Sequence, residues 1–233
     1  MRAIAVVPTY NERANLAELL EKLQQFSTEL HVLIVDDNSP DGTGDLADEL
    51  SRRNPDRIFV LHREKKDGLG KAYVDGFKEA LKGEYDYIVQ MDADLSHDPS
   101  HLPRFFEKIQ NHDLVVGSRY LQGISVVNWD LKRLILSKTA TNYVRFVTGM
   151  PFTDATSGYA CWRREALASV GFEDAFSSGY VFLVEMKYKA YRKGFRVTEV
   201  PIIFIERKSG DSKLDWRVFL EAVWRVLKLR FKY

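Results

Sequence analysis

The stretch DYIVQMDADLSHDP, residues 86–99, decides the expected fold and shows where its functional end lies. The apolar run from Tyr87 to Met91 has the composition of a buried strand, and it passes directly into Asp92-Ala93-Asp94. Carboxylates are rarely left unpaired against a core, because desolvating an unpaired charge is expensive. The two aspartates are therefore expected to face a ligand beyond the end of the strand.

Short apolar runs alternate with helical patterns on both sides of this stretch. Strands are expected at residues 3–7, 31–37, 57–62, 86–92 and 113–120. Between them, apolar residues at helical spacing predict amphipathic helices around residues 16–26, 46–50, 72–81 and 102–109. Such an alternation predicts an α/β fold with a mainly parallel central sheet and helices on both faces.

Polar residues gather where this kind of sheet binds its ligand, beyond the carboxyl ends of the strands. They are the PTYNE segment after the first strand, Asp36-Asp37 after the second, Asp92-Ala93-Asp94 after the fourth and Ser118-Arg119 after the fifth. All four groups are expected along one edge of the sheet.

A divalent cation is the ligand that suits Asp92 and Asp94. Both carboxylates follow one strand end, where the turning chain lets them reach one point. Magnesium and manganese take few protein ligands and complete their shell with water and substrate phosphates. The alternative is a pair of solvated turn residues, and the acidic pair Asp36-Asp37 on a neighbouring strand favours the metal.

Two common nucleotide-binding motifs are absent. The glycine-rich run from Gly68 to Lys71 is not a P-loop, and Pro8-Thr9-Tyr10 stands where a dinucleotide-binding fold has its glycines. His97 and His101 lack the glutamate of H-E-x-x-H, so a zinc site is not expected there.

Composition narrows the class further. The 233-residue chain has a formal charge of +1, which gives no reason to expect nucleic acid as a partner. Its single cysteine, Cys161, excludes an intramolecular disulfide and suits a reducing compartment. The N-terminus does not resemble a secretory signal, and no apolar run approaches the roughly 18 residues of a membrane span. A soluble protein, or one that lies on a membrane surface, is expected.

The second half of the chain is less regular. Helices are expected over 132–147 and 180–192, a loop over FTDATSGYACWR (152–163) and one strand over RVTEVPIIFIER (196–207). From Asp215 onward a basic amphipathic pattern with two tryptophans predicts a C-terminal helix, which either lies on a membrane or closes the core.

Taken together, the motifs resemble the inverting family 2 glycosyltransferases of GT-A fold, and among them the dolichol-phosphate (polyprenyl-phosphate) mannosyltransferases. The motifs run in order over residues 3–214 and are PTYNE, VDDNSPDGT, GLGKA, MDADLSHDP, VGSRY, TSGY and the R-x-x-G-x-S-K run 207–213. The resemblance implies a GT-A catalytic domain over 1–212, followed by the amphipathic helix 213–233.

The resemblance also implies roles for individual residues. Donor-binding residues would be Pro8, Tyr10, Glu12, Val35 and Asp37 at the nucleoside, Asp92, Ala93, Asp94 and Ser96 at the metal end, and Arg207 and Lys213 over the diphosphate. The metal ligands among them would be Asp92, Asp94 and Ser96, although many relatives have glutamine in place of Ser96. The catalytic set would be Asp94 with the acceptor-phosphate residues Arg119, Arg133 and Ser137.

The implied reaction moves mannose from GDP-mannose to dolichyl or polyprenyl phosphate with inversion, assisted by magnesium or manganese. A phosphate monoester is largely ionised at neutral pH, so this nucleophile needs no general base. The alternatives are a polyprenyl-phosphate glucosyltransferase that uses UDP-glucose and a non-catalytic nucleotide-sugar binding protein. A nucleotidyltransferase is disfavoured, because its first loop is usually glycine-rich and here it is PTYNE.

The resemblance places the protein at the cytoplasmic face of a membrane, as a peripheral protein. Some relatives continue into transmembrane helices, whereas this sequence ends at Tyr233. Three ways to reach the lipid are expected: the C-terminal helix, a hydrophobic groove, or a membrane partner subunit.

Overall fold

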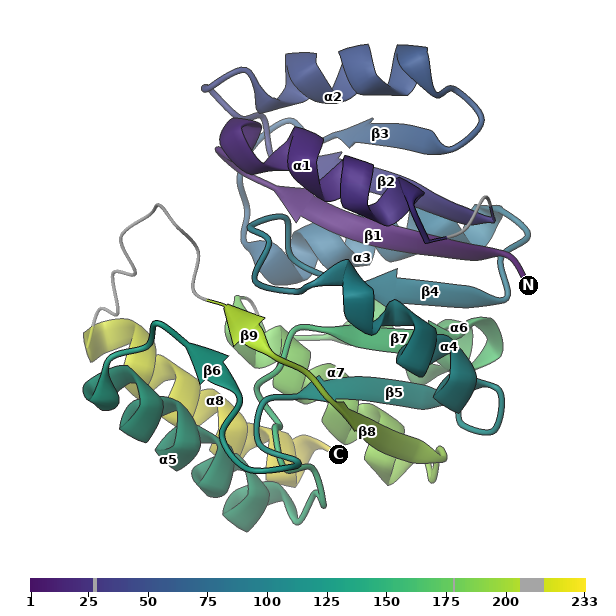
Figure 1. The fold of residues 1–233 in the computed structure, drawn as a ribbon. Helices are drawn as coiled ribbons and strands as arrows, with labels where there is room; N and C mark the ends of the chain where they lie inside the picture. Colours follow the sequence, from purple (N-terminus) through teal and green to yellow (C-terminus); the bar gives the residue numbers. More distant parts are fainter. Residues whose placement is uncertain (27–28, 178, 206–215) are drawn as a thin grey trace.

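The computed structural model describes residues 1–26, 29–177, 179–205 and 216–233, and it confirms the α/β fold (Figure 1). A seven-stranded sheet forms the centre. Its strands are β1 (Ala3–Thr9), β2 (Leu30–Asp36), β3 (Ile58–His62), β4 (Tyr87–Gln90), β5 (Leu114–Ser118), β7 (Ala160–Arg163) and β8 (Val197–Pro201).

The strand order is β3-β2-β1-β4-β7-β5-β8, and every neighbouring pair is parallel except the two that involve β7. β7 is antiparallel to β4 and β5, with Trp162 opposite Ile88 and Leu114. The prediction of a loop over residues 152–163 is therefore wrong for ACWR. These four residues carry no alternating pattern, because Ala160, Cys161 and Trp162 are all buried.

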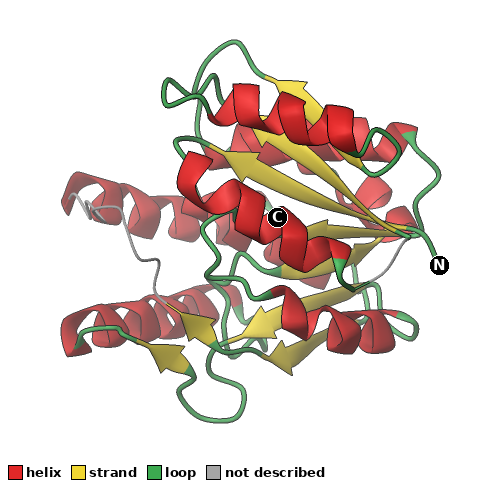
Figure 2. Cartoon of the chain, turned by 45° about the horizontal axis from the view of Figure 1, so that its top comes forward, coloured by secondary structure: helices red, strands yellow, loops and turns green. Residues whose placement is uncertain are grey.

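Helices cover both faces of the sheet (Figures 1 and 2). One face carries α1 (Arg13–Gln24), α2 (Thr43–Arg53) and α4 (Leu102–Ile109), the last preceded by the short helix η1 (Pro99–His101). The other face carries α3 (Leu69–Lys82), α6 (Arg164–Val170), η2 (Phe172–Asp174) and α7 (Tyr180–Arg192). The helices predicted in the first half are confirmed.

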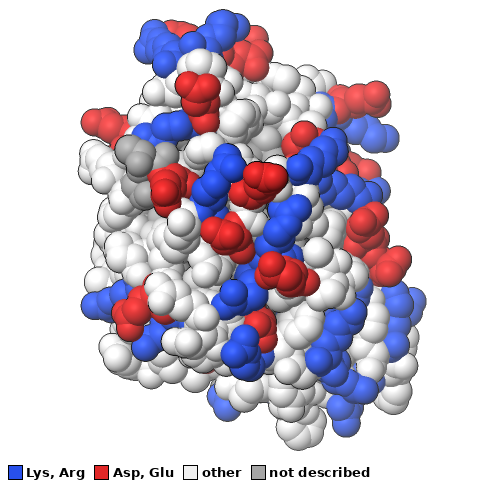
Figure 3. Space-filling view, turned by 90° about the vertical axis from the view of Figure 1, so that its right-hand side faces the viewer, with Lys and Arg blue, Asp and Glu red and all other residues white. Residues whose placement is uncertain are grey.

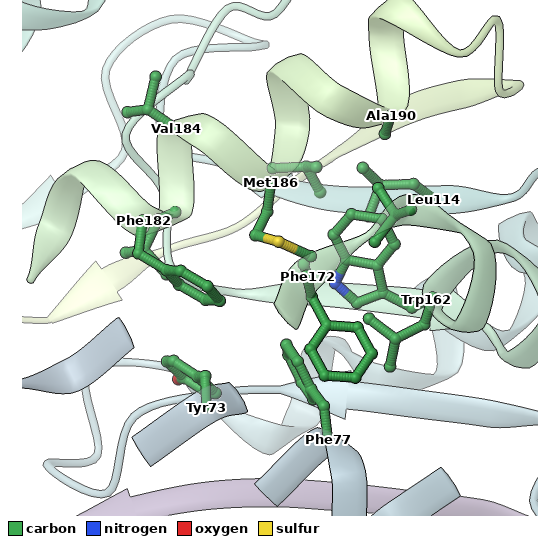
Figure 4. Packing of buried hydrophobic residues seen from close by; sticks show 14 of the residues in the cluster. Tyr73, Phe77, Leu114, Trp162, Phe172, Phe182, Val184, Met186 and Ala190 are labelled. Carbon is green, nitrogen blue, oxygen red and sulfur yellow. The ribbon is translucent and has the colours of Figure 1, made fainter. Parts of the chain in front are cut away.

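Helix α7 packs against the sheet and is deeply buried. All its residues from Val181 to Ala190 are buried. Figure 4 shows Phe182 and Met186 pointing toward Tyr73 of α3 and Trp162 of β7. The Tyr73 and Phe182 rings stack with centroids 6.3 Å apart. Because α7 is buried on all sides, its charged residues must find partners inside the protein.

Helices α5 (Leu131–Thr148) and α8 (Trp216–Lys232) lie side by side beyond the strand ends, next to the small sheet of β6 (Val126–Val127) and β9 (Phe204–Ile205) (Figure 1). The Tyr143 hydroxyl of α5 donates to the Val223 carbonyl of α8 at 2.9 Å. The single strand expected over 196–207 is wrong: it is interrupted after Pro201, and Phe204 and Ile205 pair with β6 instead of extending the central sheet.

The opposite end of the molecule, where the parallel strands begin, shows acidic and basic side chains interspersed over the middle of its surface (Figure 3). This agrees with the formal charge of +1 and gives that face no field of one sign. Among the helices that the structure describes, none combines the length and the apolar character needed to cross a bilayer.

Candidate functional site

A cavity of about 1000 Å³ lies at the carboxyl ends of the parallel strands. It brings together residues that the sequence keeps far apart, from the segments after β4 and β5 and from helices α5, α7 and α8. The predicted residues that line it are Asp92, Asp94, Ser96, Arg119, Arg133 and Ser137. The proposed metal end and acceptor end therefore share one space.

Asp92 is held by two neighbours. The Tyr73 hydroxyl donates to Asp92 Oδ1 at 3.2 Å, and the Asp92 backbone N–H donates to His97 Nδ1 at 2.9 Å. His97 is buried and stacks on the Tyr159 ring with centroids 4.9 Å apart. Burial first, and the Asp92 charge second, keep the pKa of Tyr73 well above its ordinary value, so Tyr73 remains a donor. The Asp92 carboxylate thus has a fixed position.

Asp94 is oriented by a tight turn. Its Oδ1 accepts hydrogen bonds from the Ser96 backbone N–H at 3.1 Å and from the Ser96 hydroxyl at 2.5 Å. Leu95 between them has φ of 64°, a left-handed conformation that costs energy for a residue with a side chain. Ser96 thus positions Asp94, and its contact with a metal remains a prediction.

The residues around the aspartate pair fit a magnesium or manganese ion. Within the described ranges, no three or more His, Cys, Asp or Glu side chains are arranged so that they could hold a metal ion by themselves. Two carboxylates at the wall of an open cavity are enough for these ions, since they take their other ligands from water and substrate phosphates.

The donor-binding residues predicted at the nucleoside lie at the ends of β1 and β2. Pro8 is paired with Val35 in the sheet, and the Val35 side chain is buried in the core. The Lys66 ammonium stands 3.7 Å from the centroid of the Tyr10 ring. The Glu12 backbone N–H donates to Thr43 Oγ1 at 3.0 Å.

Asp37 is the charged member of this group, and its partner was not foreseen. It forms an ion pair with Arg63, which also binds Asp75 at 2.8 Å. Burial raises the pKa of Asp37, and the contact with Arg63 opposes that rise. A smaller cavity of about 320 Å³ is lined by Arg63 and Asp75. Asp67 lines both cavities, so the smaller cavity adjoins the large one.

Arg119 is buried at the floor of the large cavity. Its Nε and Nη2 donate to the two carboxylate oxygens of Asp154 at 2.6 and 2.7 Å. The guanidinium also lies 5.3 Å from the Trp129 ring centroid. Burial alone would raise the pKa of Asp154, and the hydrogen bonds and charge of Arg119 together lower it. The pair is therefore ionised and rigid.

Arg133 and Ser137 are one turn apart on α5 and line the same cavity. The Arg133 guanidinium lies 4.6 Å from the Trp129 ring centroid, and Ser137 Oγ accepts a hydrogen bond from the Tyr120 hydroxyl at 2.8 Å. Asp130 begins this helix by accepting from the Arg133 backbone N–H at 2.8 Å. Local capping and an i, i+4 spacing thus present both side chains together.

Sequence reasoning missed three residues of the site: Tyr73, Asp154 and Lys187. Lys187 is buried, and its Nζ donates to the carbonyls of Ser157 at 2.6 Å and Leu183 at 3.0 Å. Helix α7 also carries Glu185, Lys189 and Arg192, so nothing in its sequence singled out Lys187. Arg207 and Lys213 fall outside the described residues, so their role over the diphosphate stays a prediction.

The parallel sheet with one inserted antiparallel strand, and the acidic pair beside arginines at its carboxyl edge, define a glycosyltransferase of GT-A fold. The sequence model described as Glycosyl transferase family 2 matches residues 4–171. The chain belongs to this family, and the family prediction is confirmed.

Two curated relatives are similar over nearly the whole chain. The polyprenol monophosphomannose synthase of Mycolicibacterium smegmatis is 45% identical and covers 97% of this chain and 85% of its own length. The undecaprenyl-phosphate mannosyltransferase of Micrococcus luteus is 43% identical, with 98% of this chain and 93% of its own length covered.

Solved structures support the fold. The glucosyl-3-phosphoglycerate synthase of Mycobacterium tuberculosis, in complex with Mn²⁺, UDP and glucosyl-3-phosphoglycerate, matches with a TM-score of 0.70 at 16% identity, over 99% of this chain and 79% of that chain. A mannosyltransferase of Pyrobaculum calidifontis, in complex with GDP-Man and Mn²⁺, matches with a TM-score of 0.63 at 18% identity. The match covers 99% of this chain and 63% of that chain.

Lys187 is expected to make stability depend on pH. Burial lowers its pKa from the ordinary 10.5 to about 7, against the attraction of Asp154. Between these values the unfolded chain carries the proton and the folded protein does not, so stability rises with pH. Relative to Lys187→Met, the native protein should gain about 1 kcal/mol per pH unit in urea unfolding between about pH 7.5 and pH 9.5. A constant difference between the two proteins would contradict this.

Proposed function

We propose that this protein transfers mannose from GDP-mannose to a polyprenyl phosphate, with inversion, giving a β-linked polyprenyl-phosphate mannose. The observation that carries the proposal is the large cavity, which brings the acidic pair together with Arg119 and Arg133 and with apolar side chains of α5, α7 and α8. The names of the two curated relatives, a polyprenol monophosphomannose synthase and an undecaprenyl-phosphate mannosyltransferase, point to the same sugar and acceptor.

At the donor end, Asp92 and Asp94 would hold magnesium or manganese, and Asp37 and Tyr10 would lie at the nucleoside. A divalent cation bound there supplies positive charge to the departing diphosphate. The Mn²⁺ in the neighbouring GT-A structures supports a divalent cation without deciding between the two metals. Tyr73 and Ser96 keep the two carboxylates in place through the hydrogen bonds described above.

At the acceptor end, Arg133 and Ser137 would bind the lipid phosphate, with Arg119 beneath it. An ionised phosphate oxygen attacks the anomeric carbon directly, and the nucleotide diphosphate departs from the opposite side. No protein base is needed, because the phosphate monoester is already largely deprotonated at neutral pH. The protein contributes mainly by holding two anions in line, which lowers the entropic part of the barrier.

Much of the remaining cavity wall is apolar, as an isoprenoid chain requires. These apolar walls come from three helices and are formed by Leu136, Ala140 and Val144 of α5, Val181, Leu183 and Val184 of α7, and Ala222, Val223 and Val226 of α8. The ion pair of Glu221 and Arg225 on α8 also lines the cavity. These positions begin within one helical turn of Ser137. The lipid could therefore continue from the phosphate site into the groove without passing through water.

Helices α5 and α8 would also hold the protein on the cytoplasmic face of the membrane. Each presents large apolar side chains to solvent, with exposed fractions of 57% or more at Leu131, Ile135, Phe146, Trp224 and Phe231. Exposed basic residues accompany them, among them Lys132 and Arg145 on α5 and Lys228 and Lys232 on α8. An apolar surface edged by lysine and arginine is typical of interfacial membrane helices. This arrangement brings the cavity to the lipid without a partner subunit.

The transfer assay tests the proposal directly. Radiolabel from GDP-mannose is counted in the organic phase with a short polyprenyl phosphate, with and without magnesium or manganese. Metal-dependent label is expected for the native protein and none for Asp94→Ala, with an unchanged circular dichroism spectrum. Asp98→Ala, which removes only the cap of η1, is the matched control and should retain transfer.

Label from UDP-glucose in place of GDP-mannose would contradict the donor assignment and keep the reaction type. Nucleotide binding without transfer from either donor would contradict the enzymatic proposal and support a binding protein.

Arg133→Ala is expected to raise the KM for the polyprenyl phosphate roughly tenfold to a hundredfold, because a charge-assisted contact to the phosphate is lost. The KM for GDP-mannose should change little. Arg52→Ala, an exposed arginine on α2 that does not line the cavity, serves as the control. Steady-state kinetics with each substrate varied in turn measures both constants, and equal losses for donor and acceptor would place Arg133 elsewhere.

Vesicle flotation tests the membrane surface. The purified protein alone should float with vesicles of phosphatidylcholine and phosphatidylglycerol, because α5 and α8 supply the apolar and basic contacts. The double variant Phe146→Asp with Trp224→Asp should stay at the bottom of the gradient. Tyr191→Asp, on α7, is the control for adding an acidic group to an exposed aromatic position. Flotation of all three proteins, or of none, would count against this surface.

A further inference from the structure

Asp154 has no role in the proposed reaction, although it is the most completely enclosed acidic group at the site. It lies in the segment that leads into β7, and its exposed fraction is 0%. It accepts three hydrogen bonds from Arg119: from the backbone N–H at 3.1 Å, from Nε at 2.6 Å and from Nη2 at 2.7 Å. Burying a charge this deeply costs free energy unless the charge is fully paired. The hydrogen bonds from Arg119 provide this pairing for Asp154.

The contacts of Arg119 determine which part of it can meet an anion. A guanidinium has five N–H donors in a rigid plane. Asp154 takes the donor of Nε and one of Nη2, and Thr156 Oγ1 accepts from Nη2 at 2.9 Å. The edge of the guanidinium that carries Nε and Nη2 is therefore occupied by protein acceptors. Among the described residues no acceptor binds Nη1, which leaves this nitrogen to contact a ligand in the cavity that Arg119 lines.

Asp154 is itself anchored to the central sheet. The Glu199 carboxylate of β8 accepts hydrogen bonds from the Thr153 backbone N–H at 2.7 Å, from the Thr153 hydroxyl at 3.0 Å and from the Asp154 backbone N–H at 3.0 Å. At the other end of the same segment, the Lys187 Nζ donates a hydrogen bond to the Ser157 carbonyl. The segment is thus fixed at both ends, once by β8 and once by α7.

We propose that Asp154 is a positioning residue for the transfer reaction, which fixes the Arg119 guanidinium so that its Nη1 side faces the acceptor phosphate. This role rests on the proposed function of the cavity. An exposed arginine would lose side-chain entropy each time it bound the phosphate, whereas Arg119 is already ordered by Asp154. A buried pair of this kind contributes little net stability in many proteins, so its main effect is orientation.

A double-mutant cycle separates positioning from a merely structural role. The four proteins are the native enzyme, Asp154→Asn, Arg119→Lys and the double variant, with KM and kcat measured for each substrate. Asp154→Asn keeps the shape of the side chain and removes its charge. It should raise the KM for polyprenyl phosphate by about tenfold or more, with the KM for the sugar nucleotide within about twofold of native. The double variant should be no worse than the poorer single variant, because both changes remove one function.

The matched control is Asp113→Asn. Asp113 forms a similar two-pronged contact, with Arg196 Nε at 3.2 Å and Nη2 at 3.0 Å, and neither residue lines the cavity. This variant should leave both KM values at the native level. Glu199→Gln provides a milder perturbation, which acts through the hydrogen bonds that Glu199 accepts from Thr153 and Asp154. It should raise the acceptor KM in the same direction and by a smaller factor.

The positioning role would be overturned if the losses of the two single variants multiplied in the double variant, or if the KM values of both substrates rose equally. The proposed function would stand in that case, provided that the native enzyme is active. A native enzyme that transfers no sugar to polyprenyl phosphate from either donor would overturn the proposed function, and the positioning role with it. If Asp154→Asn fails to fold, the Glu199→Gln result decides: an unchanged acceptor KM rejects the proposal.

Discussion

The buried ion pair between Arg119 and Asp154 is the interaction on which the geometry of the site depends. It ties the end of β5 to the segment that enters β7. Because β7 is antiparallel to β4 and β5, its amino end lies at the same edge of the sheet as their carboxyl ends. The segment before β7 therefore becomes part of the site. Gly158 in that segment packs against the loop after β4: an added Cβ would lie 3.2 Å from His97 Cε1 and 3.6 Å from Asp92 Oδ2.

This arrangement separates the two kinds of charge that the reaction must handle. Asp92 and Asp94 follow β4, while Arg119 follows β5, and one strand stands between them in the sheet. In the proposed reaction the acidic pair serves the metal and the departing diphosphate, and the arginines serve the entering phosphate. Fixed partners around each group mean that little reorganisation is needed when charge moves between the two phosphates. In the proposed function, apolar side chains of α5 and α8 extend the acceptor side of the cavity toward a lipid surface.

Much of this was predictable from sequence, and the exceptions have physical causes. Parallel strands leave a strong pattern because they are apolar runs that end in polar residues, which gave β1 to β5 and the Asp92–Asp94 pair. Strand β7 left none, since it is only four residues long and three of them, Ala160, Cys161 and Trp162, are buried without alternation. Asp154 and Lys187 were missed because a buried charge can be identified only together with its partner. Arg119 lies 35 residues from Asp154 in the sequence, and Ser157 lies 30 residues from Lys187. The break between β8 and β9 depends on pairing with β6, which no local pattern reveals.

The central claim is that a lipid phosphate attacks the sugar directly within one cavity, with no covalent sugar–protein intermediate. The anomeric configuration of the product tests this most directly. The lipid-linked sugar made from an α-linked sugar nucleotide can be analysed by NMR through the one-bond carbon–proton coupling at the anomeric carbon. A β-linked product is predicted, because a single displacement inverts the centre. An α-linked product would mean retention, by two successive displacements or by attack on the face that the diphosphate leaves, and either would contradict the account.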